Sequence, residues 1–240
     1  LLVTLCGLFF TSVLIGIINS GIENKMTELQ RGKSVVFERD HIVMLGFGET
    51  AILILKQLVI SGENQRRQVI VILDDKRKAD IENEIRLKIP DPKTTRFVCR
   101  SGKPSNIYDL KMCSPETCRC VIIACDDDYC SLQAILAMSK IMGAHECPSV
   151  HITTTVSDTK NIDAMRIAGA GRVETISLQR TISRIIAHSC LQPGISAVFT
   201  ELFNFEGNEI YVEAIAEAAG MRFDRANLRF CSSTLIGLVR

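Results

Sequence analysis

Apolar residues divide the chain into an uncharged first stretch and a longer part in which short apolar runs alternate with helical patterns. Residues 1–22 contain no charged side chain. About 20 helical residues, at ~1.5 Å rise each, span the ~30 Å hydrocarbon core of a bilayer. We therefore expect 1–22 to form a transmembrane helix. A signal peptide and a buried core helix are the alternatives, although neither the basic segment nor the cleavage site of a signal peptide is clear here.

A mixed-charge segment, 23–40, follows the apolar run, and we expect it to be a linker. Lys25, Arg31 and Lys33 lie close to the end of the apolar run. Because basic residues are enriched on the cytoplasmic side of membrane helices, this end is expected to face the cytoplasm. One apolar helix cannot enclose a pore, so it would have to pack with helices of other subunits or of a longer chain.

From His41 onward, apolar runs alternate with helical stretches. The runs that predict strands are 41–48, 68–75, 94–102, 120–128, 149–158 and 172–177. Helices are expected between them, over 49–61, 76–89, 104–113, 129–143 and 160–168. Strands alternating with helices form right-handed βαβ units, so the fold class is α/β with a Rossmann-like, doubly wound parallel sheet. We expect this domain to span 41–191.

The last part, 192–240, is expected to hold a hinge helix and the start of a C-terminal subdomain. Proline and glycine at 193–194 interrupt two helical stretches, and an edge strand is predicted at 208–215. The apolar side chains of the two helices are expected to bury against a second copy or a sister module. They are Ile185, Ile186, Val198, Leu202 and Phe203.

The amino-acid composition argues against some classes of function, among them nucleic-acid binding and zinc binding. Hydrophobic residues make up 47% and charged residues 23%, as in ordinary globular proteins. The net charge of +1 lacks the basic surplus of a nucleic-acid binder, and 5% aromatics without Trp argue against a base-stacking surface. The ten cysteines never form two CxxC pairs, so we interpret them as reduced thiols rather than as zinc ligands.

The first crossover carries Gly46-x-Gly48-x-x-Ala51, the alanine-ended form of the dinucleotide fingerprint. In that fingerprint the first glycine allows a tight turn, the second lets the backbone approach a pyrophosphate, and the third position packs the helix on the strand. Asp74 ends the next strand, where a ribose-binding acid belongs. The alternative is that the glycines serve only packing and Asp74 caps a helix.

An acidic triplet, Asp126-Asp127-Asp128, ends the fourth strand, at the edge where open α/β sheets bind ligands. It could bind a cation such as Ca²⁺ through carboxylate oxygens, or cap the following helix. None of the four histidines has a nucleophile or metal partner at a recognisable spacing, so we expect no catalytic residues and no enzyme.

Four segments together resemble the Castor and Pollux ion-channel family, whose regulator-of-conductance (RCK) domains have a Rossmann-type sheet. They are RGKSVVFERDHIVMLGFG (31–48), CRSG (99–102), QPG (192–194) and FNFEGNEIYV (203–212). The resemblance implies that 1–22 is the inner, pore-lining helix and that RCK modules of four subunits form a gating ring. It adds Arg100, within CRSG, to the candidates for a nucleotide site.

The resemblance also implies a potassium or calcium channel and a homotetramer in contact with membrane lipid, and the composition above predicts no nucleic-acid partner. The expected location is the nuclear envelope or another organelle membrane, with the RCK domain on the cytoplasmic or nucleoplasmic side. The regulatory ligand stays open between Ca²⁺, NAD and none. The competing hypotheses are a membrane-anchored, NAD-binding oxidoreductase-like domain and a potassium-uptake subunit without its own pore helix.

Overall fold

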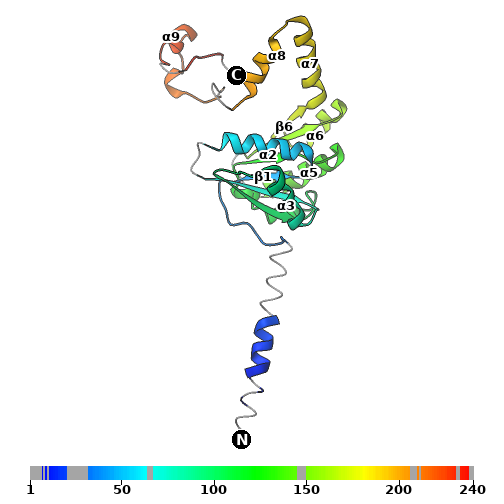
Figure 1. Ribbon diagram of the computed structural model, residues 1–240. Helices are drawn as coiled ribbons and strands as arrows, with labels where there is room; N and C mark the ends of the chain where they lie inside the picture. The colour runs from blue at the N-terminus through cyan, green and yellow to red at the C-terminus, as the bar shows by residue number, and fades with distance from the viewer. Residues whose placement is uncertain are drawn as a thin grey trace. The chain divides into compact units, whose positions relative to one another are not determined.

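The computed structural model describes residues 7, 9, 11–20, 32–63, 67–144, 150–205, 210, 212–230 and 233–237. The chain divides into two compact units, residues 1–192 and 193–240, which are considered separately below. The first unit holds the sheet and most of the helices (Figure 1).

The first unit is built on a six-stranded sheet with strand order β3-β2-β1-β4-β5-β6. Every neighbouring pair is parallel, which confirms the predicted doubly wound sheet. The strands are β1 (Ile42–Leu45), β2 (Gln68–Asp74), β3 (Thr95–Ser101), β4 (Cys120–Ile123), β5 (His151–Val156) and β6 (Val173–Ser177). The order reverses beside β1, and the crevice at such a reversal is where open α/β sheets bind ligands.

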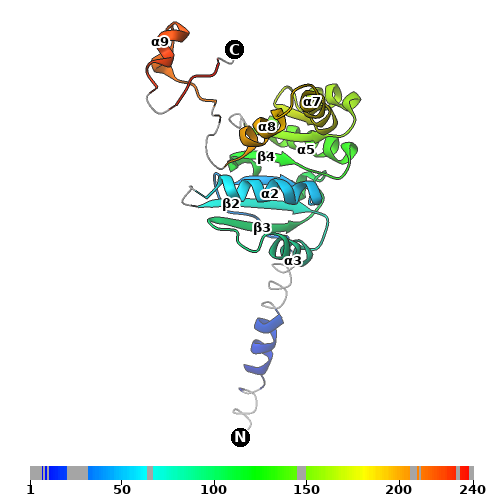
Figure 2. The ribbon, with the colours of Figure 1, turned by 45° about the horizontal axis from the view of Figure 1, so that its top comes forward.

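Helices cover both faces of the sheet, as Figure 2 shows for α2. On one face, α2 (Glu49–Ser61) and α3 (Lys78–Lys88) pack Leu55 and Ile81 against Met44 and Ile72. On the other, α4 (Ile107–Lys111), α5 (Asp128–Ala144) and α6 (Ile162–Ala168) pack on the alternate side chains of the same strands. Because both faces are covered, β1 is buried along its whole length, as its uninterrupted apolar sequence predicts.

Short 3₁₀ segments lie in the connections, at Pro115–Thr117 and Thr159–Asn161. After β6, the chain enters α7 (Leu178–Leu191), an amphipathic helix that buries none of its residues. Several of its apolar side chains are exposed, including Ile182 at 54% and Ile186 at 58%, whereas Ile185 is half-buried.

The second unit contains α8 (Ile195–Phe203), a 3₁₀ segment (Ala216–Ala218) and α9 (Phe223–Asn227). Helix α8 also buries no residue. Gly194 precedes it with φ +91, a conformation that favours glycine, so the predicted break at the Pro-Gly pair is confirmed. The edge strand expected at 208–215 does not form over the described residues 210 and 212–215.

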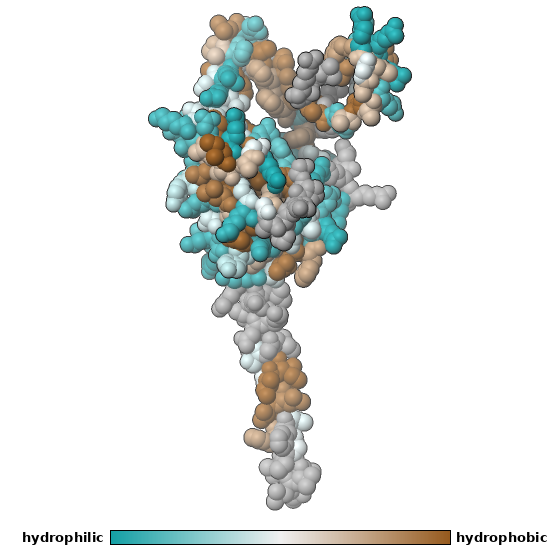
Figure 3. Space-filling view, turned by 180° about the vertical axis from the view of Figure 1, so that it is seen from behind, coloured by the Kyte–Doolittle hydropathy of each residue, from teal (hydrophilic) through white to brown (hydrophobic). Residues whose placement is uncertain are grey.

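Near the N-terminus, residues 11–20 are helical. Their apolar side chains are exposed and form the brown surface of this segment in Figure 3; they include Val13, Leu14, Ile15, Ile17 and Ile18. Much of the expected transmembrane segment, 1–22, lies outside the described residues, as does 23–31 of the linker. Within the described ranges, no helix combines the length and the apolar character needed to cross a membrane.

Candidate ligand site at the carboxyl edge of the sheet

Gly46 forms the turn at the end of β1, and the backbone around it requires a glycine. Its φ is +92, and a Cβ there would lie 2.7 Å from the carbonyl oxygen of Ala124 and 2.9 Å from the Cα of Cys125. The turn is further held by the Gly46 N–H, which donates to the carbonyl oxygen of Leu73 at 2.9 Å. Gly46 therefore allows β1 and β4 to end side by side.

Gly48 precedes α2 in an extended conformation, with φ −130 and ψ −166, and no side chain caps this helix. A Cβ on Gly48 would meet only the carboxylate of Asp126. Ala51, the third fingerprint position, is fully buried against the sheet. All three fingerprint residues thus lie in a strand–turn–helix, the context in which this motif binds a pyrophosphate.

Asp74 lies at the end of β2 and hydrogen-bonds the glycine turn directly. Its Oδ2 accepts from the Phe47 N–H at 2.8 Å, and its Oδ1 accepts from the Lys76 N–H at 3.0 Å. Partial burial raises the pKa of Asp74 above its usual value, although both hydrogen bonds oppose the shift. The carboxylate therefore lies where a ribose acid is expected, but it already bonds to backbone groups of this edge.

Lys76 was not anticipated from the sequence. Its Nζ donates to the carbonyl oxygen of Phe47 at 2.7 Å and lies 5.4 Å from the centre of the Phe47 ring. It places a positive charge beside the glycine turn. The only signal in the sequence is a lysine shortly after the strand-ending Asp74.

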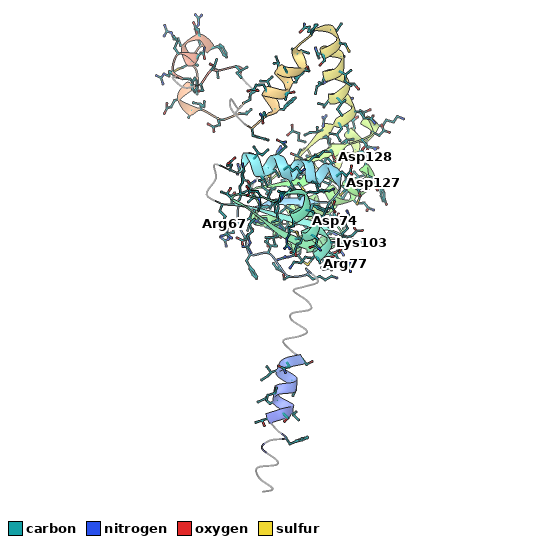
Figure 4. All side chains as sticks on the ribbon, viewed as in Figure 1. Arg67, Asp74, Arg77, Lys103, Asp127 and Asp128 are labelled. Carbon is teal, nitrogen blue, oxygen red and sulfur yellow. The ribbon has the colours of Figure 1, made fainter. Side chains whose placement is uncertain are left out.

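The acidic triplet is divided among three different contacts. Asp126 lies against Gly48. Asp127 caps α5 by accepting from the Cys130 N–H at 2.5 Å. Asp128 accepts from the N–H groups of Ser157 and Asp158 and from Asn161, at 2.8–2.9 Å. Figure 4 shows Asp74, Asp127 and Asp128 at the same edge of the sheet.

The hydrogen bonds to Asp128 change its acidity. Burial by itself raises the pKa of this carboxyl, but the bonds from Ser157, Asp158 and Asn161 together lower it below the usual value. Asp128 thus joins the β4–α5 connection to the one after β5. Within the part of the chain that the structure describes, no three His, Cys, Asp or Glu side chains are grouped to hold a metal ion.

Arg100, the remaining candidate, contacts the linker. Its Nε donates to the carbonyl oxygen of Ser34 at 2.6 Å, and a terminal nitrogen donates to the carbonyl oxygen of Cys99 at 2.9 Å. Burial lowers the pKa of the half-buried guanidinium, which is still charged at neutral pH.

The linker is attached to the domain at several further points that sequence reasoning missed. Glu38 pairs with Arg67 at 3.2 Å and with Arg96 at 2.9 Å. The Val36 N–H donates to the carbonyl oxygen of Met112 at 2.8 Å, and Val36 is buried in the core. The partners lie about 30 to 80 positions away along the chain, so no local pattern could have revealed them.

A parallel 3-2-1-4-5-6 sheet with a glycine turn at its first crossover defines a Rossmann-type domain. Comparison with known proteins makes this more specific: the chain belongs to the TrkA-N domain family, whose model matches residues 42–176. Residues 179–240 match a second family model, described as Castor and Pollux, part of voltage-gated ion channel. The resemblance expected from the sequence is therefore confirmed.

Two relatives illustrate the similarity. The chain is 30% identical over 220 residues to the probable ion channel SYM8 of Pisum sativum, covering 90% of this chain and 25% of that protein. It is 28% identical over 235 residues to the ion channel CASTOR of Lotus japonicus, covering 97% and 28%. The chain thus spans about a quarter of their length. Both are named as channels, in agreement with the expectation that the chain is not an enzyme.

Among solved structures, the TrkA-N domain of the inner membrane protein ybaL from Escherichia coli is similar at a TM-score of 0.48 and 15% identity. That similarity covers 64% of this chain and 98% of the ybaL domain.

Proposed function

We propose that the chain is the gating region, with the last pore helix, of a ligand-regulated cation channel. Residues 1–22 would line the pore, 23–40 would connect them to the sheet, and 41–191 would form an RCK domain. The hinge helix and the start of the C-terminal subdomain would occupy 192–240. The similarity to relatives named as ion channels, over nearly the whole chain, supports this proposal.

The structural observation that carries the proposal is the attachment of residues 32–40 to the domain. Arg100 holds Ser34, Met112 holds Val36, and Arg96 holds Glu38. A displacement of the sheet would therefore move this segment with it, and the segment leads towards the N-terminal helix along the chain. Such an attachment is what a domain needs in order to pull on a pore helix.

The linker also meets the candidate ligand edge. The Ser101 N–H donates to the carbonyl oxygen of Gly32 at 3.3 Å, and the next residue, Gly102, donates to the carbonyl oxygen of Asp74 at 2.8 Å. Binding at this edge would shift the gate only if the ligand preferred one arrangement of the domain, because a ligand with equal affinity for both changes nothing. A nucleotide such as NAD at the glycine turn, or Ca²⁺, is the proposed ligand class.

Assembly into a homotetramer within a membrane completes the proposal. The apolar faces of α7 and α8, which bury no residue in the described part of the chain, support contacts with other copies, because large exposed apolar faces mark interaction surfaces. Contact with membrane lipid and a nuclear-envelope or other organelle membrane follow from the resemblance, and the near-zero net charge supports a channel that binds no nucleic acid.

Single-channel recording of the full-length protein in planar bilayers tests the proposal. We expect cation currents whose open probability changes when NAD, ADP or Ca²⁺ is added separately to the side that holds the sheet. The matched control is Ile15→Arg, because a charge at the centre of a spanning helix costs about 2.5–3.5 kcal/mol on insertion scales. It should abolish the currents. Currents that ignore all three ligands would refute a ligand-gating role.

A further inference from the structure

The space beside Gly48 is the feature from which a further inference can be drawn. We call the space beside the Cα of Gly48, on the side toward which a Cβ would project, the phosphate seat, because the second fingerprint glycine lets a pyrophosphate approach the backbone there. In this structure the carboxylate of Asp126 lies in the phosphate seat: its Oδ1 is in close contact with the position that a Cβ on Gly48 would take, and its Cγ lies 3.6 Å from that position. A phosphate and this carboxylate cannot occupy the seat together.

The carboxylate suits the seat electrostatically. The first N–H groups of α2 have no side-chain cap at Gly48, and the start of a helix favours a negative group. Asp126 therefore places a negative group close to the start of α2, where a bound phosphate would place one. A phosphate brought beside it would meet a like charge.

The carboxylate is also free to leave. Asp126 is exposed, and among the described residues its side chain makes no hydrogen bond, whereas Asp127 and Asp128 are both hydrogen-bonded to neighbouring backbone groups. A change in its side-chain torsions is enough to clear the seat without moving β4 or α5.

We propose that Asp126 is an internal anion that occupies the phosphate seat of the glycine turn and competes with the phosphate of a regulatory nucleotide. The inference rests on the proposed function, in that it assumes a nucleotide ligand at this edge. It makes Asp126 a specificity-determining residue, because it lowers affinity for phosphorylated ligands without affecting the nucleoside part.

Binding of ADP and of adenosine to the full-length protein, measured by calorimetry, tests this role. In Asp126→Asn the carboxylate becomes a neutral amide of the same size. We expect ADP to bind at least tenfold more tightly than to the wild type and adenosine affinity to stay within twofold. The control is Asp163→Asn, which removes the same charge from an exposed position in α6 and should leave both affinities unchanged.

Asp126→Ser provides a second variant, with a smaller side chain that leaves the seat open, and should also tighten ADP binding. Thermal melting of each variant confirms that it is folded. Equal ADP affinity in the wild type and both Asp126 variants would overturn the inference while leaving the nucleotide site standing. A gain for adenosine as large as that for ADP would overturn it too. Absence of ADP binding to every folded variant would overturn both the inference and the nucleotide site, whereas the channel assignment depends on the current recordings.

Discussion

Gly46 and Gly48 belong to one motif but differ in what surrounds them. At Gly46 both the positive φ and the backbone of Ala124 and Cys125 exclude a side chain. At Gly48 the backbone is extended, and only the end of the Asp126 side chain is in the way. The first glycine is thus required by the fold, whereas the fold does not require the second, which under the proposed function serves a bound nucleotide.

Alanine at each glycine separates these roles. Gly46→Ala should lower the free energy of unfolding by about 2–4 kcal/mol, because a left-handed conformation and an overpacked contact each cost about 1–3 kcal/mol. Gly48→Ala should cost less than about 1 kcal/mol, as surface substitutions do, while weakening ADP binding. Urea unfolding measures the free energy of unfolding of both variants. Equal destabilisation by the two variants would contradict this assignment.

The hydrogen bonds of Asp128 stabilise the fold, and the pH dependence of that stabilisation can be predicted. Asp128→Asn keeps the shape but replaces one acceptor oxygen with a donor that faces N–H groups, so it should cost about 1–2 kcal/mol at pH 7. Because the pKa of Asp128 is lowered by folding, its contribution is complete above the ordinary aspartate pKa and is lost as the pH falls through the folded value. The difference in unfolding free energy between wild type and Asp128→Asn should therefore shrink as the pH falls from about 5 to 3. If this difference in unfolding free energy grew on acidification, folding would have to raise the pKa of Asp128 and not lower it.

At the scale of elements, the described part of the expected linker, residues 32–40, is attached to the sheet domain although it forms no strand. Residues 32–40 bond to β3, to Arg67 just before β2 and to Met112 just after α4, although they precede β1 in the sequence. Val36 is buried, whereas Phe37 is 93% exposed. The segment is therefore held by its backbone and by Arg100 and Glu38 rather than by apolar packing along its length.

Removing the guanidinium of Arg100 should loosen this attachment. In Arg100→Gln the bond to Ser34 is lost, and we expect amide exchange over 32–40 to become about fivefold faster, as the loss of about 1 kcal/mol of local stability implies. Hydrogen-exchange mass spectrometry measures this. The control is Arg86→Gln, on the exposed side of α3. Unchanged exchange in 32–40 would mean that Arg100 does not hold the linker.

At the scale of the whole molecule, the apolar faces of α7 and α8 predict self-association. Ile182 and Ile186 lie four positions apart on α7, and Val198 and Leu202 do so on α8. Side chains four positions apart share one face of a helix, so each helix carries an apolar stripe. Burial of one such side chain is worth about 1.5–3 kcal/mol, so burial of either stripe against another copy would favour assembly.

Ile186→Glu should therefore weaken assembly by at least about 100-fold in dissociation constant, because each copy loses an apolar contact and gains a buried charge. Ala187→Glu places the same charge about 100° around α7 from Ile186, away from the apolar stripe, and is the control. Light scattering and sedimentation give the masses. If both variants kept the mass of the wild type, the α7 stripe would not be an assembly surface.

The sequence alone predicted the sheet and its crossovers. Each strand is a local apolar run, and each following helix begins within a few residues. Because βαβ crossovers are right-handed, few arrangements of these strands and helices are possible. The glycine fingerprint at 46–51 was also readable, because a turn that needs a positive φ is encoded locally. The edge strand at 208–215 was the exception: its alternating pattern was present, but the described residues 210 and 212–215 form no strand.

The tertiary structure alone decided what the charged residues contact. Asp126, Asp127 and Asp128 are adjacent and chemically identical, yet one lies in the phosphate seat, one caps a helix and one ties two loops together. Arg100, grouped with the nucleotide candidates, holds Ser34, which lies 66 positions earlier. Hydrophobic periodicity depends on near neighbours and can be read along the chain. A carboxylate or a guanidinium bonds to whichever groups folding brings within about 3 Å, and those groups are set by packing between distant segments.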